Sequence, residues 1–243
     1  MKIIALDIET ANLDMDAEGL KFDDPKGWKT SVVCTYNSKT QQNNIYVGKD
    51  DYPSVVRKCG GQLGMVFPFE LLQYHLRTWR NEGYLLLTHN GEGFDFPIMS
   101  KTRKEGGVGS VKSLLAKWPE TQKLDMAAYL KKETGIRYRL NHLIHGLLGE
   151  DASKLMDAAN APIEWNKGNH EGVIRYCIDD CQKTYMVLIE ALTGRLFKAI
   201  GKEEYVEVKT PPTYTNMDGK THVATGGLPL WKREGHSTIH KED

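Results

Sequence analysis

Residues 2–9 have the sequence KIIALDIE, in which apolar side chains fill both alternating faces until Asp7 and Glu9 appear. Apolar residues on both faces indicate a central strand that is buried on both sides. Asp7 and Glu9 are two residues apart, so their side chains leave the same face of that strand. They also lie at its carboxyl end, where an α/β sheet presents its ligand crevice. This segment therefore predicts the first strand of an α/β sheet, with a candidate site at its end.

The rest of the chain predicts a mixed sheet with helical cover. Bulky apolar runs bounded by turn residues predict further strands at 31–36, 44–47, 84–88 and 124–126. Apolar residues at helical spacing predict helices at 68–81, 110–117, 126–133, 140–148 and 171–193. Strands come mostly first and helices then alternate with strands. This order favours an α/β fold with a mixed five-stranded sheet covered by helices.

The composition is that of an ordinary folded protein. Of 243 residues, 40% are hydrophobic, so a sizeable core can form and global disorder is excluded. Lysine plus arginine and aspartate plus glutamate both number 32, so no chain-wide basic field attracts nucleic acid or membrane. No apolar stretch is long enough for a membrane span or a signal-peptide core. We therefore expect a cytoplasmic protein without a membrane partner.

One domain with an appendage is the expected organisation. Residues 1–204 are predicted to form the main domain and residues 205–243 a C-terminal extension of unknown role, because Pro, Gly and polar residues accumulate there. This tail is expected to be partly extended and partly disordered. The four cysteines, with Cys177 and Cys181 four residues apart, match neither a disulfide framework nor a zinc-ligand spacing.

Two acids on one face of a buried strand repel each other. The arrangement costs free energy unless protons, water or cations compensate. A divalent metal ion is therefore the natural partner of Asp7 and Glu9. The alternative is that the strand ends at Asp7 and that water solvates both carboxylates.

The segment THNGEGFDFP, residues 88–97, follows a predicted strand and carries further polar side chains. It turns at Asn90 and Gly91 and begins a helix near Asp95, with a proline in the first turn. In isolation, Asp95 could be only a helix N-cap and Asn90 only a turn residue.

The last predicted helix carries Tyr176 and Asp180, which are four residues apart. This spacing puts the two side chains one turn apart on one face. A buried tyrosine beside an aspartate is unremarkable in a helix without a site. The pair gains weight only in combination with the other two motifs.

Taken in order, these elements resemble the motifs of the DEDD superfamily of 3′-to-5′ exonucleases. The D-x-E motif is Asp7 to Glu9, the N-x3-F-D motif is Asn90 to Asp95, and the Y-x3-D motif is Tyr176 to Asp180. Arg175 stands where the histidine branch of the family has its histidine, so the tyrosine branch, DEDDy, is indicated. The segments HNGEGFDFP and RYCIDDC are similar to the exonuclease domains of family B DNA polymerases. The resemblance covers roughly residues 1–195 and implies a ribonuclease H-like fold.

The resemblance implies that four carboxylates hold two divalent cations. Oxygen-only ligands favour Mg²⁺ or Mn²⁺. The implied roles are Asp7 bridging both ions, Glu9 and Asp180 holding the ion that activates water, and Asp95 holding the ion on the leaving-group side. Tyr176 would orient the attacking water, because a phenol that titrates at about pH 10 is a poor general base at neutral pH. The implied catalytic residues are thus Asp7, Glu9, Asp95, Tyr176 and Asp180.

Candidate substrate contacts surround these acids. The residues expected to bind substrate are Ile8, Thr10, Asn90 and Phe94. Phe94 could instead be a core residue beneath the second motif. Between Lys101 and Arg139, ten lysines and arginines stand against four acids. This basic stretch could follow the phosphate backbone of a substrate, or it could be a set of solvated helix faces.

Three functions remain open at this level. The first is a metal-dependent 3′-to-5′ exonuclease that releases nucleoside monophosphates from single-stranded DNA. The second is an exoribonuclease that trims RNA 3′ ends, as ribonuclease D-like members of the family do, because the sequence does not separate the two sugars. The third is a non-catalytic nucleic-acid-binding module. The presence of all four acids argues against the third.

Overall fold

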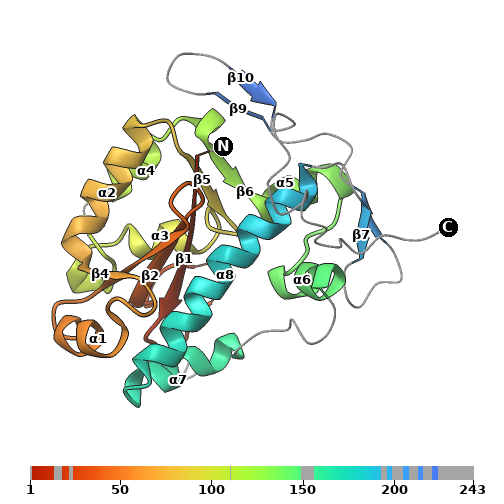
Figure 1. The fold of residues 1–243 in the computed structure, drawn as a ribbon. Coiled ribbons are helices and arrows are strands. Elements are labelled where there is room, and N and C mark those ends of the chain that lie inside the picture. Colours follow the sequence, from red (N-terminus) through yellow and green to blue (C-terminus); the bar gives the residue numbers. More distant parts are fainter. Residues whose placement is uncertain are drawn as a thin grey trace.

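The computed structural model describes most of the chain up to residue 192 and four short segments beyond it. The described residues are 2–13, 18–21, 24–109, 111–148, 156–192, 196–198, 205–207, 213–215 and 221–223. Their architecture is a mixed sheet with helices on both faces (Figure 1). The predicted fold class, an α/β fold with a mixed sheet covered by helices, is confirmed.

The central sheet of the described chain has six strands. They are β1 (Ile3–Thr10), β2 (Thr30–Asn37), β3 (Gln42–Val47), β4 (Met65–Pro68), β5 (Leu85–Thr88) and β6 (Lys123–Asp125). Their order across the sheet is β4-β3-β2-β1-β5-β6. β1 lies inside the sheet, antiparallel to β2 and parallel to β5. The ends of β1 and β5 therefore meet at the same edge of the sheet, where the first two motifs lie.

The expected count of five strands is wrong by one edge strand. All five predicted strands are present, and the sixth is β4, which pairs in parallel with β3 at the margin of the sheet. β4 ends at Pro68, a residue that has no N–H to donate and is tolerated only at a sheet edge. The predicted helix at 68–81 begins at this proline. The four residues of β4, which end at it, are therefore not predicted as a separate strand.

Eight α-helices surround the sheet in the described chain. They are α1 (Tyr52–Cys59), α2 (Phe69–Asn81), α3 (Asp95–Met99), α4 (Lys112–Ala116), α5 (Met126–Thr134), α6 (Leu140–Leu148), α7 (Ala161–Asn166) and α8 (His170–Ala191). The described residues also include three short 3-10 helices: η1 (Arg103–Glu105), η2 (Glu120–Gln122) and η4 (Ala158–Asn160). α1 and α7 are not among the predicted helices, although both are longer than α4, which is. Both begin with a proline in the first turn, where its missing N–H costs nothing.

Alternation along β1 divides the core into two layers. Ile3 and Ala5 pack with side chains of α1, α5, α6, α7 and α8. Ile4, Leu6 and Ile8 pack on the opposite face with side chains of α2, α3 and α4. β1 is therefore buried on both faces, as its sequence predicts. α8 is the long helix that crosses the first of these faces in Figure 1.

The chain after α8 is described only in short strands. β7 (Leu196–Lys198) pairs with β8 (Tyr205–Glu207), and β9 (Thr213–Thr215) pairs with β10 (Thr221–Val223). Residues 224–243 and the expected disorder of the tail lie outside the described residues. The division between 1–204 and 205–243 stays a prediction. No helix among the described residues has the length and apolar character needed to cross a membrane.

Candidate active site

Strand β1 carries its acids on the face that α8 covers. Asp7 and Glu9 continue the alternation of Ile3 and Ala5, which pack against the α8 layer. β1 runs on to Thr10, and Glu9 is only 8% exposed. The alternative in which the strand ends at Asp7 and water solvates both acids is therefore wrong.

Helix α8 brings Asp180 to these two acids. Asp7, Glu9 and Asp180 each offer a carboxylate oxygen, and these atoms all lie within 4.8 Å of one another. Carboxylates at this spacing repel unless protons or cations lie between them. Burial accordingly raises the pKa of Asp7 well above its ordinary value, and the charges of Asp95, Asp180 and Glu9 raise it further. The three side chains thus form an acidic cluster that could hold a metal ion.

Asp95 approaches this cluster from the second motif. It is the first residue of α3, and Phe94 holds the N-cap position. Its Oδ1 accepts a hydrogen bond from the backbone N–H of Ile8, 3.1 Å away, so Asp95 faces β1 and is not a helix cap. Burial raises the pKa of Asp95 to about 7, with the charges of Asp125 and Asp180 also raising it. Asp95 therefore lies beside the three clustered acids, close enough for the charges to affect one another.

Tyr176 lies one turn before Asp180 on α8. Its ring is 1% exposed and belongs to the core layer beneath α8. Burial raises the pKa of its phenol, and so do the charges of Asp180, Glu9 and Asp7 and a hydrogen bond with Asp180. The phenol therefore stays protonated at neutral pH and can donate a hydrogen bond. The Tyr176 hydroxyl therefore lies among carboxylates, whereas the hydroxyl of an ordinary core tyrosine contacts solvent or a backbone carbonyl.

Cysteine thiols line the inner wall of the acidic cluster. The Sγ of Cys177 lies 3.5 Å from both the backbone oxygen and Oδ2 of Asp7. Cys181 contacts the backbone oxygen of Cys34 at 3.3 Å, on the neighbouring strand β2. All four cysteines of the chain are free and buried. The sequence gives one signal for this wall, because Cys177 and Cys181 each follow a motif residue on α8 directly.

The turn before α3 is tightly constrained. Asn90 has a positive φ of 70°, and a Cβ on Gly91 would lie 2.5 Å from the Cβ of Thr88. Asn90 is therefore a turn residue, as its sequence context predicts. Its side chain is also engaged, because Arg137 donates a hydrogen bond to its Oδ1. Arg137 thus reaches the candidate site, although its sequence position identifies it only as one member of the basic stretch.

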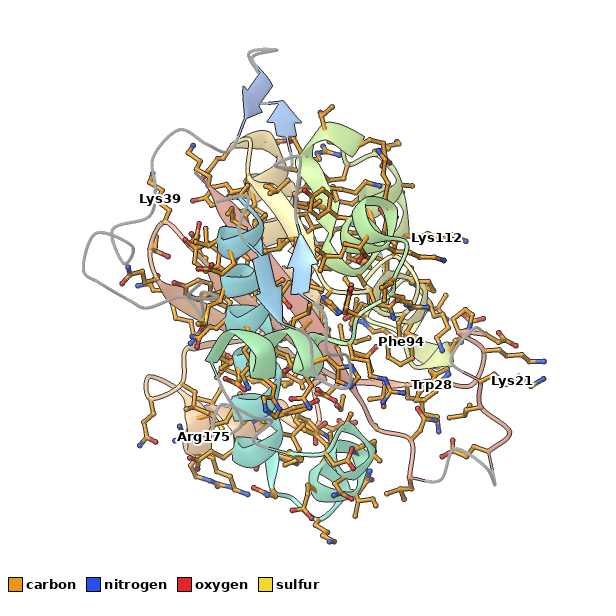
Figure 2. All side chains as sticks on the ribbon, turned by 90° about the vertical axis from the view of Figure 1, so that its right-hand side faces the viewer. Lys21, Trp28, Lys39, Phe94, Lys112 and Arg175 are labelled. Atoms are coloured by element: carbon orange, nitrogen blue, oxygen red, sulfur yellow. The ribbon has the colours of Figure 1, made fainter. Side chains whose placement is uncertain are left out.

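Phe94 is partly buried: it packs against the core layer of α2, α3 and α4 and directly precedes Asp95. It is half-buried and packs edge-on against Trp28, with ring centroids 5.2 Å apart. Figure 2 labels the two rings, which lie next to each other. The indole Nε1 of Trp28 donates to the backbone oxygen of Lys21 at 2.9 Å, which fixes the ring. Trp28 belongs to none of the three motifs. Its contact with Phe94 could not be predicted from the sequence, because the two residues are far apart in the chain.

The other two expected substrate contacts are more enclosed. Ile8 packs in the layer opposite α8, and its backbone N–H is the group that meets Asp95. Thr10 is a buried polar residue at the end of β1. The structure brings both close to the acids along one strand. Their contact with a substrate stays a prediction.

The basic stretch is not a single free surface. Several of its cations bind other parts of the protein: Lys101 donates to the carbonyls of Pro25 and Trp28, Arg103 pairs with Glu70, and Lys123 pairs with Glu120 and Glu92. These contacts join the stretch to α2, to the loop before β2 and to the turn before α3. Part of the positive excess therefore serves the fold.

Fold and site together define an α/β domain with an acidic cluster suited to divalent cations. In a comparison with solved structures, the family B DNA polymerase of the hyperthermophilic archaeon Pyrobaculum calidifontis is similar in fold, with a TM-score of 0.52 and 16% sequence identity. The match covers 80% of this chain and 25% of the polymerase, so this chain spans about a quarter of that protein's length. No family model and no curated protein matches the sequence. The likeness supports the fold, and the function has to be argued from the site.

Proposed function

We propose that this chain is a metal-dependent 3′-to-5′ exonuclease of the DEDDy type that releases nucleoside monophosphates from single-stranded DNA. The observation that carries the proposal is the meeting of Asp7, Glu9 and Asp180, whose oxygens lie within 4.8 Å of one another although Asp180 follows the other two by more than 170 positions. The motif order supports it, because Asp95 and Tyr176 adjoin the same cluster. The fold likeness to a family B DNA polymerase is consistent with it.

The residues present fit divalent cations. The donors are hard carboxylate oxygens, and the raised pKa values of Asp7 and Asp95 indicate negative charge that the protein itself leaves uncompensated. Asp7, Glu9, Asp180 and Asp95 would hold two Mg²⁺ or Mn²⁺ ions. Such ions supply charge neutralisation for the phosphate and a lowered pKa for a bound water.

The remaining residues of the site position the reactants. Tyr176 keeps its proton because its pKa is raised, so it acts as a hydrogen-bond donor that orients the attacking water and not as the general base. Phe94 is half-buried and precedes Asp95 directly, so its ring would stack with a terminal base. Asn90, Ile8 and Thr10 complete the proposed contacts with the strand end.

The test is digestion of end-labelled oligonucleotides. A 5′-labelled single strand incubated with Mg²⁺ or Mn²⁺ should give a descending ladder, and a chelator should stop the reaction. Undiminished turnover after exhaustive chelation would rule out the metal-dependent mechanism, and immediate release of the label as a mononucleotide would rule out the polarity. RNA of identical sequence, run in parallel, decides between the DNA exonuclease and the RNA-trimming alternative. Tight binding without turnover of either strand would favour a non-catalytic module.

A further inference from the structure

Asp125 is a buried acid at the end of β6 that lies outside the three motifs. It is 9% exposed, and its two carboxylate oxygens accept four backbone N–H groups. Oδ1 accepts from Asn90 at 2.8 Å, Ala127 at 3.0 Å and Ala128 at 3.2 Å, and Oδ2 accepts from Glu92 at 3.1 Å. One carboxylate thus joins the N-terminus of α5 to the turn of the second motif, 35 residues earlier.

Capping α5 requires only part of this arrangement. A helix N-cap satisfies the N–H groups of the first turn with one side-chain oxygen. Here the bonds to Ala127 and Ala128 come from Oδ1. The bond from Oδ2 to Glu92 serves the turn alone. A carboxylate rather than a simple cap is therefore needed at this position.

The turn that Asp125 holds leads directly to Asp95. Asn90 has a φ of 70°, a left-handed conformation that asparagine adopts more readily than most residues and that turns the chain toward α3. From this turn, Phe94 N–H donates to the carbonyl of Asn90 at 3.0 Å and Phe96 N–H to that of Gly91 at 2.8 Å. These bonds set the start of α3. The position of Asp95 against β1 therefore depends on the conformation that Asp125 stabilises.

We propose that Asp125 is a positioning residue of the exonuclease site: its carboxylate fixes the turn at residues 90–92 and thereby holds Asp95 in place beside Asp7. The inference rests on the proposed function, because it assigns a task to Asp125 in the same site. Asp125 acts through the backbone of the turn and not by contact with substrate.

The substitution Asp125→Asn separates positioning from helix capping. Asparagine caps helices about as well as aspartate, so its remaining oxygen preserves the bonds to Ala127 and Ala128. Its amide nitrogen replaces Oδ2 and presents N–H groups to the N–H of Glu92, so that bond is lost. We expect kcat to fall by roughly 10- to 100-fold with KM changed less than about 3-fold, the range found for residues that orient metal ligands. The melting temperature should stay within about 4 °C of the wild type.

Two measurements that do not depend on turnover accompany the kinetics. Hydrogen exchange at the Glu92 amide should accelerate in Asp125→Asn, while exchange at Ala127 and Ala128 stays unchanged. Calorimetric titration with Mn²⁺ alone should give an affinity lowered by about 10-fold or more. Asp157→Asn is the matched control, because Asp157 is also an aspartate that caps a helix. Its side chain accepts a hydrogen bond from the Ala159 N–H, 3.2 Å away, at the start of η4.

The outcomes separate the two proposals. An inactive wild type would overturn the proposed function, while the Mn²⁺ and exchange data would still decide the role of Asp125. An active wild type with normal kcat and normal Mn²⁺ affinity in Asp125→Asn would overturn the positioning role. Loss of activity together with faster exchange across α5 would also overturn it, because it would mean a purely structural cap.

Discussion

The two faces of strand β1 differ in a way that separates stability from function. On one face, Ile4, Leu6 and Ile8 are apolar up to the buried Thr10 at the end of the strand, and they pack in one core layer. On the other face, which α8 covers, the apolar residues of the strand are followed by Asp7 and Glu9. A buried apolar side chain contributes to stability, whereas clustered carboxylates oppose folding.

The difference teaches where to look for chemistry. Proteins are only marginally stable, so a face that replaces apolar contacts with repelling charges loses a substantial part of a small margin. Positions that break a local folding rule are where a functional site is expected. On one face of β1 the buried positions carry apolar side chains, as a folding core requires, and on the other face Asp7 and Glu9 replace them. The predictions below test whether the broken face serves catalysis.

The largest expected effect comes from removing an acid on the charged face. Asp180→Ala should lower turnover by roughly 10³-fold or more, because the cluster loses one of the three carboxylates that meet within 4.8 Å. Ile4→Val on the apolar face is the matched control. It should cost about 0.5–1.5 kcal/mol of stability and leave the rate per folded molecule unchanged. Wild-type turnover by Asp180→Ala would show that the motif assignment is wrong.

A smaller effect is expected at Tyr176, where one oxygen atom separates the catalytic role from the structural one. Tyr176→Phe keeps the buried ring and loses only the hydroxyl that adjoins Asp180. Single-turnover hydrolysis of a short single strand should slow by roughly 10- to 10³-fold, about 1.4 to 4 kcal/mol of transition-state stabilisation. The melting temperature and Mn²⁺ affinity should change little. A rate equal to that of the wild type would remove Tyr176 from the catalytic residues while leaving the carboxylates in place.

The comparison of the two faces also marks what the sequence can predict. The alternation in residues 2–9 predicts both the burial of β1 and the shared face of Asp7 and Glu9, because a period of two is a local property. Five of the six strands of the described sheet and most of its helices follow from local patterns for the same reason. β4, α1 and α7 are missed, and length does not separate them from the predicted elements, because β6 is shorter than β4 and α4 is shorter than α1 and α7.

The contacts that shape the site are less accessible to sequence reasoning. Ile8 N–H meets Asp95 across 87 positions of the chain, and Trp28 packs on Phe94 from a loop without any motif. Such contacts depend on how distant segments pack, and a local pattern does not contain that information. Asp125 illustrates the same limit, since in the sequence it appears only as one acid near the end of a weak strand.

The smallest expected effect is a change of stability with pH in metal-free buffer. Asp95 has a folded-state pKa of about 7, above its ordinary value of 3.8. Between these values the folded protein binds more protons than the unfolded chain, so the free energy of unfolding must fall as pH rises from about 4 to about 7. Asp7 contributes in the same direction, because its pKa is also raised. The apolar face of β1 has no group that titrates in this range.

Asp95→Asn isolates this effect, because asparagine keeps an oxygen for the Ile8 N–H and cannot ionise. At about pH 4 the wild type and the variant should melt at similar temperatures, since Asp95 is then protonated in the folded protein. As pH rises to about 7, the wild type should fall below the variant, by about 4 °C or more, because Asp95 ionises in the unfolded wild type but stays protonated in the folded protein, whereas asparagine has no proton to lose. Mn²⁺ should reverse the order at neutral pH, since a cation bound to the folded state stabilises it and the variant lacks one ligand. If the melting temperatures of the two proteins differ by the same amount at all pH values, and Mn²⁺ has no effect, ionisation of Asp95 on the charged face of β1 does not lower the free energy of unfolding.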